Sequence, residues 1–337
     1  MKKEYYIFDI TKFILSLLIV QIHIGLFSTY NIATEELFKN LIGRYAVPLF
    51  FMISSYLLFD KIDKDHLFSL ENKYIYNRYI SRLLILYTSW LIIYFISLKF
   101  IFNMDISITQ FISSYFTDGL YRQFWYLNAQ ILGTILFLIL LRSFSINKIL
   151  IISIILYIFG LILVPYNSIF IKIFPFIPKY EGNVLMCRNF LTFALVYISI
   201  GYYINLLKTK KINIKLMSYL SAIFFILSII EFIYLKNIDC KYYALLIFIL
   251  LSSSCICTIL PRINLKPKKI YIKLRKYSIL IYCLHTLIYL FLEKGLSKYP
   301  LFNNSIIMYI TTVITCIIIS ELIMYIDKKI IKLKFLY

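Results

Sequence analysis

The sequence predicts an all-α integral membrane protein, a polytopic helical bundle of about ten transmembrane helices with the N and C termini in the cytoplasm. Of its 337 residues, 61% are hydrophobic and only 15% are charged. A soluble domain of this size has too little interior to hide that much apolar surface. The apolar residues also recur in runs of about 20 residues, the length that a helix needs to cross the hydrocarbon core.

The apolar runs define the predicted spans in chain order. They cover residues 7–27, 41–59, 80–102, 124–141, 149–164, 184–207, 216–235, 242–260, 277–292 and 305–326. These runs are helices rather than barrel strands, because every backbone polar group in hydrocarbon must be paired internally and barrel strands are far shorter. No soluble domain is visible between them, so residues 1–337 are expected to form a single integral membrane domain.

The basic residues set the predicted orientation. With the N-terminus inside, the inner segments hold about three times as many Lys and Arg residues as the outer loops. The net charge of +20 therefore reflects membrane topology and does not indicate a nucleic-acid partner. The six cysteines lie mostly in apolar runs without metal-type spacing, so no metal site is expected.

The first span carries ionisable groups, which cost about 3 kcal/mol each inside a bilayer and are therefore functional candidates. Lys12 lies near its inner end and His23 in its outer half. At about 100° per residue, the spacing of these two residues places both on one face, about 16 Å apart along the axis. Asp9 and Ser16 lie near the same face. The alternatives are a lysine that snorkels to the interface and a hydrogen-bonded packing histidine.

Further polar residues are expected at the depth of His23, toward the outer leaflet. Arg44 opens the second span, and Pro48 is expected to mark its first turn or to kink it. Trp125 opens the fourth span, where an aromatic-belt anchor is the alternative to a site residue. Arg188 opens the sixth span.

The ninth span carries a polar stripe. Ser278, Tyr282 and His285 are spaced i, i+4, i+7, so they share one helical face. Such a stripe is expected to face the interior of the bundle, either as part of a site or for tight helix packing.

These residues and spacings resemble the membrane acyltransferase-3 family of bacterial O-acyltransferases. The matching elements are Asp9 to Lys12 followed by His23, the stretch from Arg44 to Tyr56, Phe124 to Leu127, the Arg188 helix that ends at Gly201 and Tyr202, and the helix of Ser278, Tyr282 and His285. The resemblance covers nearly the whole chain. Three positions depart from common family residues: Lys12 replaces arginine, Ser55 replaces glycine, and Gln123 replaces histidine.

The resemblance implies transfer of an acyl group, usually acetyl, from cytoplasmic acyl-CoA to a hydroxyl of a cell-envelope or surface glycan. The expected enzyme is thus a multi-pass protein of the cell (plasma or inner) membrane. It uses acyl-CoA as a substrate without a permanently bound cofactor. Its expected partners are acyl-CoA, a glycan or lipid-linked glycan, and membrane lipid.

The resemblance also implies roles for the candidate residues. His23 is expected to act as a general base or to carry the acyl group transiently. Lys12, with Asp9 nearby, is expected at the donor end, and Arg44 and Arg188 are expected to stabilise the oxyanion or to hold the acceptor. The expected supporting residues are Ser16, Trp125, Ser278, Tyr282 and His285.

Two other classes of function fit a helical membrane bundle. An exporter of a polysaccharide or lipid-linked glycan would also use intramembrane arginines and tyrosines along a sugar path. A sensory membrane domain is the third interpretation. Consumption of acyl-CoA by protein purified in detergent, where transport is impossible, separates the enzyme from the exporter.

Overall fold

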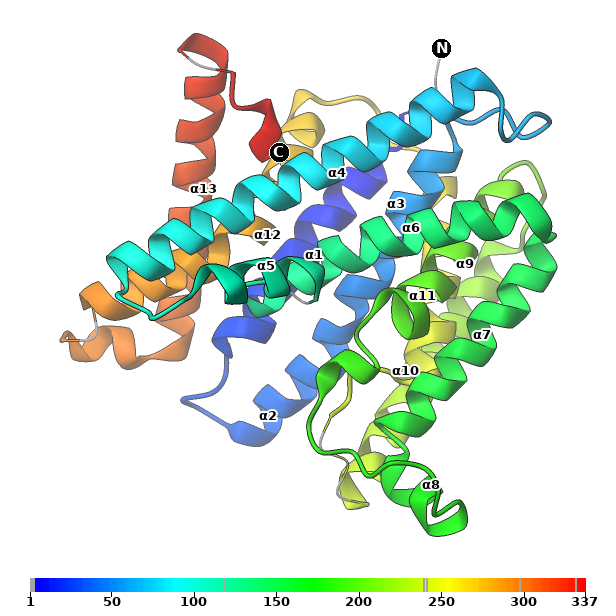
Figure 1. Cartoon of the computed structure of the whole chain (residues 1–337), viewed down its shortest axis with the longest axis horizontal. Coiled ribbons are helices and arrows are strands. Elements are labelled where there is room, and N and C mark those ends of the chain that lie inside the picture. The colour runs from blue at the N-terminus through cyan, green and yellow to red at the C-terminus, as the bar shows by residue number, and fades with distance from the viewer. Residues whose placement is uncertain (1–3, 118, 239, 241, 297, 331) are drawn as a thin grey trace. The chain divides into compact units, whose positions relative to one another are not determined.

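The computed structural model describes residues 4–117, 119–238, 240, 242–296, 298–330 and 332–337. Within these residues every regular element is a helix (Figure 1). The α-helices are α1 (Tyr6–Ile24), α2 (Ile32–Leu37), α3 (Ala46–Phe59), α4 (Leu70–Ile96), α5 (Ile108–Phe116), α6 (Trp125–Ser143), α7 (Ile146–Leu163), α8 (Asn167–Ile173), α9 (Leu195–Leu206), α10 (Ile214–Asn237), α11 (Ile247–Ile259), α12 (Lys269–Leu296) and α13 (Ser305–Lys329).

The predicted polytopic bundle is confirmed. Nine helical segments among the described residues are long and apolar enough to cross a membrane. A shorter apolar helix, Ile247–Arg262, occupies the place of the predicted eighth span. The chain is therefore a multi-pass membrane protein, and the direction in which it crosses stays a prediction.

Several helices extend beyond their predicted spans. The third predicted span begins at residue 80, whereas α4 begins at Leu70, and the ninth begins at residue 277, whereas α12 begins at Lys269. Lys and Arg are good helix formers, so a helix continues through basic residues that hydropathy excludes from the membrane. Pro48 lies in the first turn of α3, directly after the 3-10 turn Gly43–Tyr45, as one of the two predicted alternatives stated.

The predicted loop over residues 103–123 contains an additional helix, α5. Its first turn is closed by a capping box: Ser107 Oγ accepts from the Gln110 N–H at 3.1 Å, and Gln110 Oε1 accepts from the Ser107 N–H at 2.9 Å. Ile108, Ile112 and Phe116 are spaced four apart and are exposed. Hydropathy does not reveal this helix, because its apolar residues form a stripe rather than a run.

The chain divides into two compact units. The first comprises Met1–Ala46, Thr88–Asn103 and Ile263–Tyr337. In it α1 packs against α12 and α13, and α12 packs against α13. Trp90, in the α4 segment of this unit, donates its Nε1–H to the carbonyl oxygen of Leu336 at 3.1 Å. This unit contains both ends of the chain and the first and ninth predicted spans.

The second unit comprises Val47–Tyr87 and Met104–Arg262. In it α6, α7 and α9 pack together, and α10 packs against α11. The α3 and α9 backbones approach closely at Gly201, where an added Cβ would lie 2.4 Å from the Met52 carbonyl oxygen. Buried Glu231 on α10 accepts the free N–H groups of Ile247 and Phe248 at 2.8 and 3.0 Å, and thereby caps α11.

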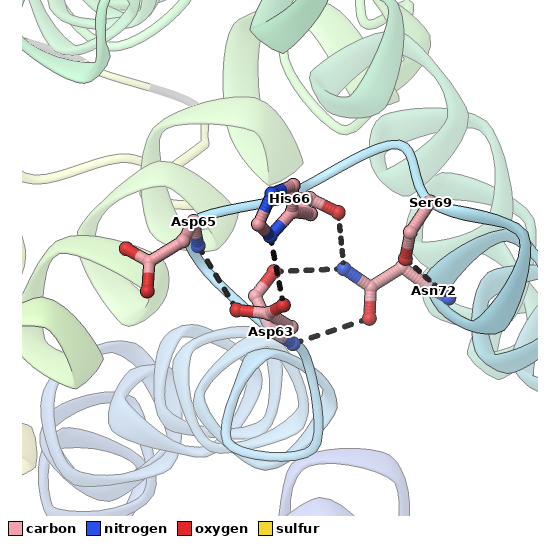
Figure 2. Close-up of polar contacts among 5 residues, drawn as sticks. All are labelled: Asp63, Asp65, His66, Ser69 and Asn72. Carbon is pink, nitrogen blue, oxygen red and sulfur yellow. Dashed lines mark hydrogen bonds and ion pairs between the residues drawn. The ribbon is translucent and has the colours of Figure 1, made fainter.

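Polar contacts fold the loop between α3 and α4 onto the start of α4 (Figure 2). The buried Asn72 side chain donates to the carbonyl oxygens of Asp63 and His66 at 2.7 and 2.8 Å and accepts from the Asp63 N–H at 3.1 Å. The Asp63 carboxylate lies 3.2 Å from the ring Nδ1 of His66. These contacts replace the backbone hydrogen bonds that the loop lacks.

Candidate active site

In the first unit, two histidines from opposite ends of the sequence lie side by side. His23 lies in the last turn of α1 and His285 in α12, with their ring centroids 5.2 Å apart. Helix α1 ends at Ile24, and the next residue, Gly25, has a φ of +78°, which is strained for any other residue type. His23 is half-buried, whereas His285 is fully buried.

The surroundings of His285 determine its tautomer. Its Nδ1 lies 3.0 Å from the Ile281 carbonyl oxygen and 2.9 Å from that of Tyr282. Both neighbours accept hydrogen bonds only, so Nδ1 carries the proton and the Nε2 of the neutral ring has a lone pair. Nε2 is buried and has no hydrogen-bond partner among the described residues. The ring therefore keeps an unused acceptor beside His23.

A hydrogen-bonded tyrosine flanks His285. The Tyr94 hydroxyl lies 2.8 Å from the Cys283 carbonyl oxygen, 2.6 Å from Thr286 Oγ1 and 3.1 Å from the Leu287 amide nitrogen. Its side chain is fully buried. Because α4 and α12 are far apart in the sequence, the sequence pattern did not suggest this contact.

Arg44 lies close to the end of α1. It belongs to a short 3-10 turn, Gly43–Tyr45, that precedes α3. The preceding Gly43 packs on Ile22, since an added Cβ would lie 2.6 Å from that side chain. Arg44 therefore lies in a turn that packs on α1 at Ile22, the residue before His23, and its Nη2 donates to Asn40 Oδ1 at 3.1 Å.

At the predicted inner end of α1, Asp9 forms an ion pair across to α12. Arg275 Nε and Nη2 donate to the two carboxylate oxygens of Asp9 at 2.7 and 2.8 Å. Asp9 is buried, so this bidentate pair compensates its charge and fixes α1 against α12. Lys12 follows one turn later and is half-buried. Buried Ser16 donates to the Phe13 carbonyl oxygen of its own helix at 2.7 Å.

In the second unit, an arginine is held over an aromatic face. The Arg188 guanidinium carbon lies 4.6 Å from the centre of the Trp125 ring. Its Nη1 donates to the Tyr242 hydroxyl at 2.7 Å, and its Nη2 donates to the Arg122 carbonyl oxygen at 3.2 Å. Phe193 meets the Trp125 ring edge-on at 5.3 Å. The cation is thus fixed in one orientation without a carboxylate partner among these contacts.

A cationic group lies at the predicted inner end of the second unit. Lys64 Nζ donates to the Asn205 carbonyl oxygen at 3.1 Å, and Lys208 pairs with Asp60 at 2.8 Å. Burial, and then the neighbouring Lys208 charge, lower the pKa of Lys64. Lys64 thus binds a backbone carbonyl group in the last turn of α9, which is a common position for lysine.

Comparison with known proteins decides the family. The family model described as "Acyltransferase domain" matches residues 5–325. The chain belongs to the acyltransferase-3 family. The recognition made from the motifs is therefore confirmed, and every candidate site residue lies within the matched segment.

Two relatives of this acyltransferase-3 chain, both from Enterococcus faecalis, bear the name "Amino-acid racemase". One is 25% identical over 331 residues, which cover 95% of this chain and 46% of the relative. The other is 26% identical over 203 residues, which cover 58% of this chain and 27% of the relative. The chain thus spans about half the length of the first relative and about a quarter of the second. No solved structure matches it.

Within the acyltransferase-3 chain, the candidate residues form separate groups. His23 and His285 meet, Arg44 lies in the adjoining turn, and Arg188 meets Trp125. Ser278 and Tyr282 share the buried stripe of His285. Asp9 binds Arg275 and lies apart from the histidine pair by most of the length of α1. Sequence reasoning missed Tyr94, Arg275 and Tyr242.

Proposed function

We propose that the chain is an integral membrane O-acyltransferase that moves an acyl group, usually acetyl, from cytoplasmic acyl-CoA to a hydroxyl of a cell-envelope or surface glycan. The family membership supports acyl transfer. The observation that supports the proposal most directly is the contact between His23 and His285. It places the half-buried imidazole of His23 next to the buried Nε2 lone pair of His285. A hydroxyl nucleophile is usually activated by a general base that is itself oriented by a hydrogen bond to a third group.

In the proposed reaction, the acceptor hydroxyl attacks the thioester carbonyl of acyl-CoA. One carbon–oxygen bond forms and the carbon–sulfur bond breaks. His23 takes the hydroxyl proton and returns it to the departing CoA thiolate, so the protons balance without another reactant. The products are the acyl ester and CoA with a free thiol.

The other candidate residues have proposed roles around this step. The proposed role of the buried His285 Nε2, which has no hydrogen-bond partner in the part of the chain that the structure describes, is to accept a hydrogen bond from the second ring nitrogen of His23 during the reaction and so to orient the base. The proposed role of Arg44, in the turn that packs on α1 at Ile22, is to stabilise the negative charge that develops on the carbonyl oxygen. Arg188, with its fixed guanidinium, holds the acceptor. Lys12 attracts the anionic part of CoA, and Asp9 acts indirectly by fixing α1 to α12.

The two relatives named as racemases do not change this proposal. Their printed name describes proteins of which this chain covers at most 46%. The proposed chemistry therefore derives from the family match over residues 5–325 and from the histidine pair. The proposed location is the plasma or inner membrane.

The proposal is tested with protein purified in detergent, acetyl-CoA and an envelope-glycan extract from the source cells. The measurements are release of the CoA thiol and the mass of the glycan product. We expect thiol release by the parent protein and at least a thousandfold loss, about the scale of removing a general base, in His23→Ala. His66→Ala is the matched control, because His66 lies in the exposed loop of Figure 2.

Two results would contradict this proposal. If the parent protein consumed no acetyl-CoA with the extract while it bound or moved glycan in vesicles, the exporter interpretation would replace it. If His23→Ala inserted normally and retained transfer, the histidine pair would have no part in the reaction.

A further inference from the structure

The hydroxyl of Tyr94 has all of its hydrogen-bonding capacity used by one short segment of α12. A phenol has one proton to donate and two lone pairs. The proton goes to the Cys283 carbonyl oxygen at 2.8 Å, because that oxygen only accepts. The lone pairs then accept from the Leu287 N–H at 3.1 Å and from the Thr286 hydroxyl at 2.6 Å. The hydroxyl is fully satisfied, which is required at a fully buried position.

The two backbone groups that Tyr94 binds are partners in a regular helix. An α-helix joins the N–H of residue 287 to the carbonyl oxygen of residue 283. The Tyr94 hydroxyl hydrogen-bonds to both Leu287 and Cys283, so a side chain from α4 bridges the two backbone groups of this turn of α12. Hydrogen bonds from a buried side chain of another helix fix this turn of α12 in one geometry.

His285 lies between these two backbone positions. Its ring is anchored one turn back, by the Ile281 and Tyr282 carbonyl oxygens, and this anchor leaves Nε2 as the acceptor. A change in the α12 backbone between residues 283 and 287 therefore rotates the ring relative to His23. Tyr94 hydrogen-bonds to the α12 backbone on both sides of His285 and to Thr286 of the same helix, so it can act on the His285 ring through α12.

We propose that Tyr94, with Thr286, is a positioning residue that holds the His285 lone pair toward His23. This inference rests on the proposed acyl-transfer function and adds a residue outside the histidine pair on which the rate of transfer depends. In this role, Tyr94 neither contacts substrate nor moves a proton. It sets the geometry in which His285 accepts the His23 N–H while His23 takes the proton of the acceptor hydroxyl.

The test compares Tyr94→Phe with the parent protein in the CoA-release assay. We expect kcat to fall about tenfold, the factor that corresponds to one hydrogen bond, because the phenyl ring fills the same space without binding α12. The KM for acetyl-CoA should stay unchanged. Trp90→Phe is the matched control, since it removes another buried hydrogen bond of α4, the one to Leu336. We expect its kcat to stay within about twofold of the parent value.

A double-mutant cycle separates positioning from a general loss of stability. His285→Gln is the partner variant, because its amide oxygen can reach the position of Nε2 but lacks the ring anchor to Ile281 and Tyr282. If Tyr94 acts through His285, adding Tyr94→Phe to His285→Gln lowers kcat by less than about twofold. Thr286→Val should reproduce part of the Tyr94→Phe defect, and this second variant covers the case in which Tyr94→Phe fails to fold.

The inference is overturned if Tyr94→Phe retains the parent kcat. It is also overturned if Tyr94→Phe lowers kcat about tenfold again in the His285→Gln background, since the two residues would then act independently. Failure of the proposed function looks different, because the parent protein itself would release no CoA. The parent rate and the cycle thus report on the two proposals separately.

Discussion

At the scale of single residues, Arg188 combines three contacts that only a guanidinium makes together. It stacks on the Trp125 ring and donates to the Tyr242 hydroxyl and the Arg122 carbonyl oxygen. A lysine ammonium keeps the charge but is compact and lacks the planar fork, so it cannot stack flat and reach both acceptors. The orientation of the cation, rather than its charge, is therefore the property to test.

We expect Arg188→Lys to reduce acyl transfer at least tenfold, about the value of one well-placed charged hydrogen bond, while the chain remains folded. The measurement is the rate of CoA release at a series of glycan concentrations. Arg142→Lys is the control, because Arg142 also stacks on an aromatic ring, that of Phe68, and has no role in the proposed site. If Arg188→Lys and Arg142→Lys lowered the rate of CoA release equally, Arg188 would have a structural role only.

The sequence located the candidate residues on their helices better than it predicted their contact partners. Spacing on one helix placed Lys12 and His23 on α1, and a stripe of period 3.6 placed Ser278, Tyr282 and His285 on one buried face of α12. The meeting of His23 with His285 depends on packing between helices that are far apart in the sequence, and helical periodicity carries no information on that.

Asp9 illustrates the same limit. Its position near Lys12 suggested a place at the donor end, and the structure pairs it with Arg275, which sequence analysis had counted only as an inner-loop charge. The ion pair is a bidentate contact between α1 and α12. The sequence predicted that both residues lie on the same side of the membrane, but it did not predict the contact between the helices.

At the scale of elements, the closest contact between α3 and α9 occurs at Gly201. The neighbouring atoms are backbone, with the Met52 carbonyl oxygen 2.4 Å and the Met52 Cα 2.9 Å from an added Cβ. Backbone atoms cannot move aside as a side chain does. The Ser55 hydroxyl also donates to the Ile198 carbonyl oxygen at 2.7 Å between the same helices. Small residues that permit such approaches are typical of membrane helix pairs.

We therefore expect Gly201→Ala to destabilise the protein by about 3 kcal/mol, the upper range for overpacking, and to lower its midpoint of thermal unfolding in detergent. Gly133→Ala is the matched control in a helix of the same unit. There the nearest atom to an added Cβ, at 2.9 Å, is the terminal methyl group of Ile198, which can rotate away. An unchanged midpoint for Gly201→Ala would mean that α3 and α9 are less closely packed than described.

Helix ends and short helices were the least predictable elements. Hydropathy located nine of the ten predicted spans among the described residues, and a shorter apolar helix at the eighth, because lipid selects apolar runs. It reports where the membrane begins and not where a helix begins. The chain therefore forms α4 and α12 well beyond their apolar parts. The capped helix α5 was missed, although its capping box is visible in the sequence as Ser107 and Gln110.

At the scale of the whole molecule, the orientation of the chain decides whether the proposed reaction is possible. In the proposed reaction acyl-CoA is cytoplasmic, and the acceptor glycan lies on the other side. With the basic loops inside, as predicted, Lys12 would lie toward the proposed donor and His23 toward the proposed acceptor. In the opposite orientation the histidine pair would open toward the cytoplasm, and transfer to an envelope glycan would have no route.

Membrane-impermeant maleimide labelling of single added cysteines in intact cells tests the orientation. Asp105 and Ser145 are exposed positions in two loops that are predicted to lie outside and inside, respectively. Five of the six native thiols are buried and Cys255 is half-buried, so the parent chain should give a low background. We expect Asp105→Cys to react in intact cells and Ser145→Cys to react only after permeabilisation. The reverse pattern would place His23 on the side of the proposed donor. The proposal of acyl transfer across the membrane would then be wrong, even if the protein consumed acetyl-CoA in detergent.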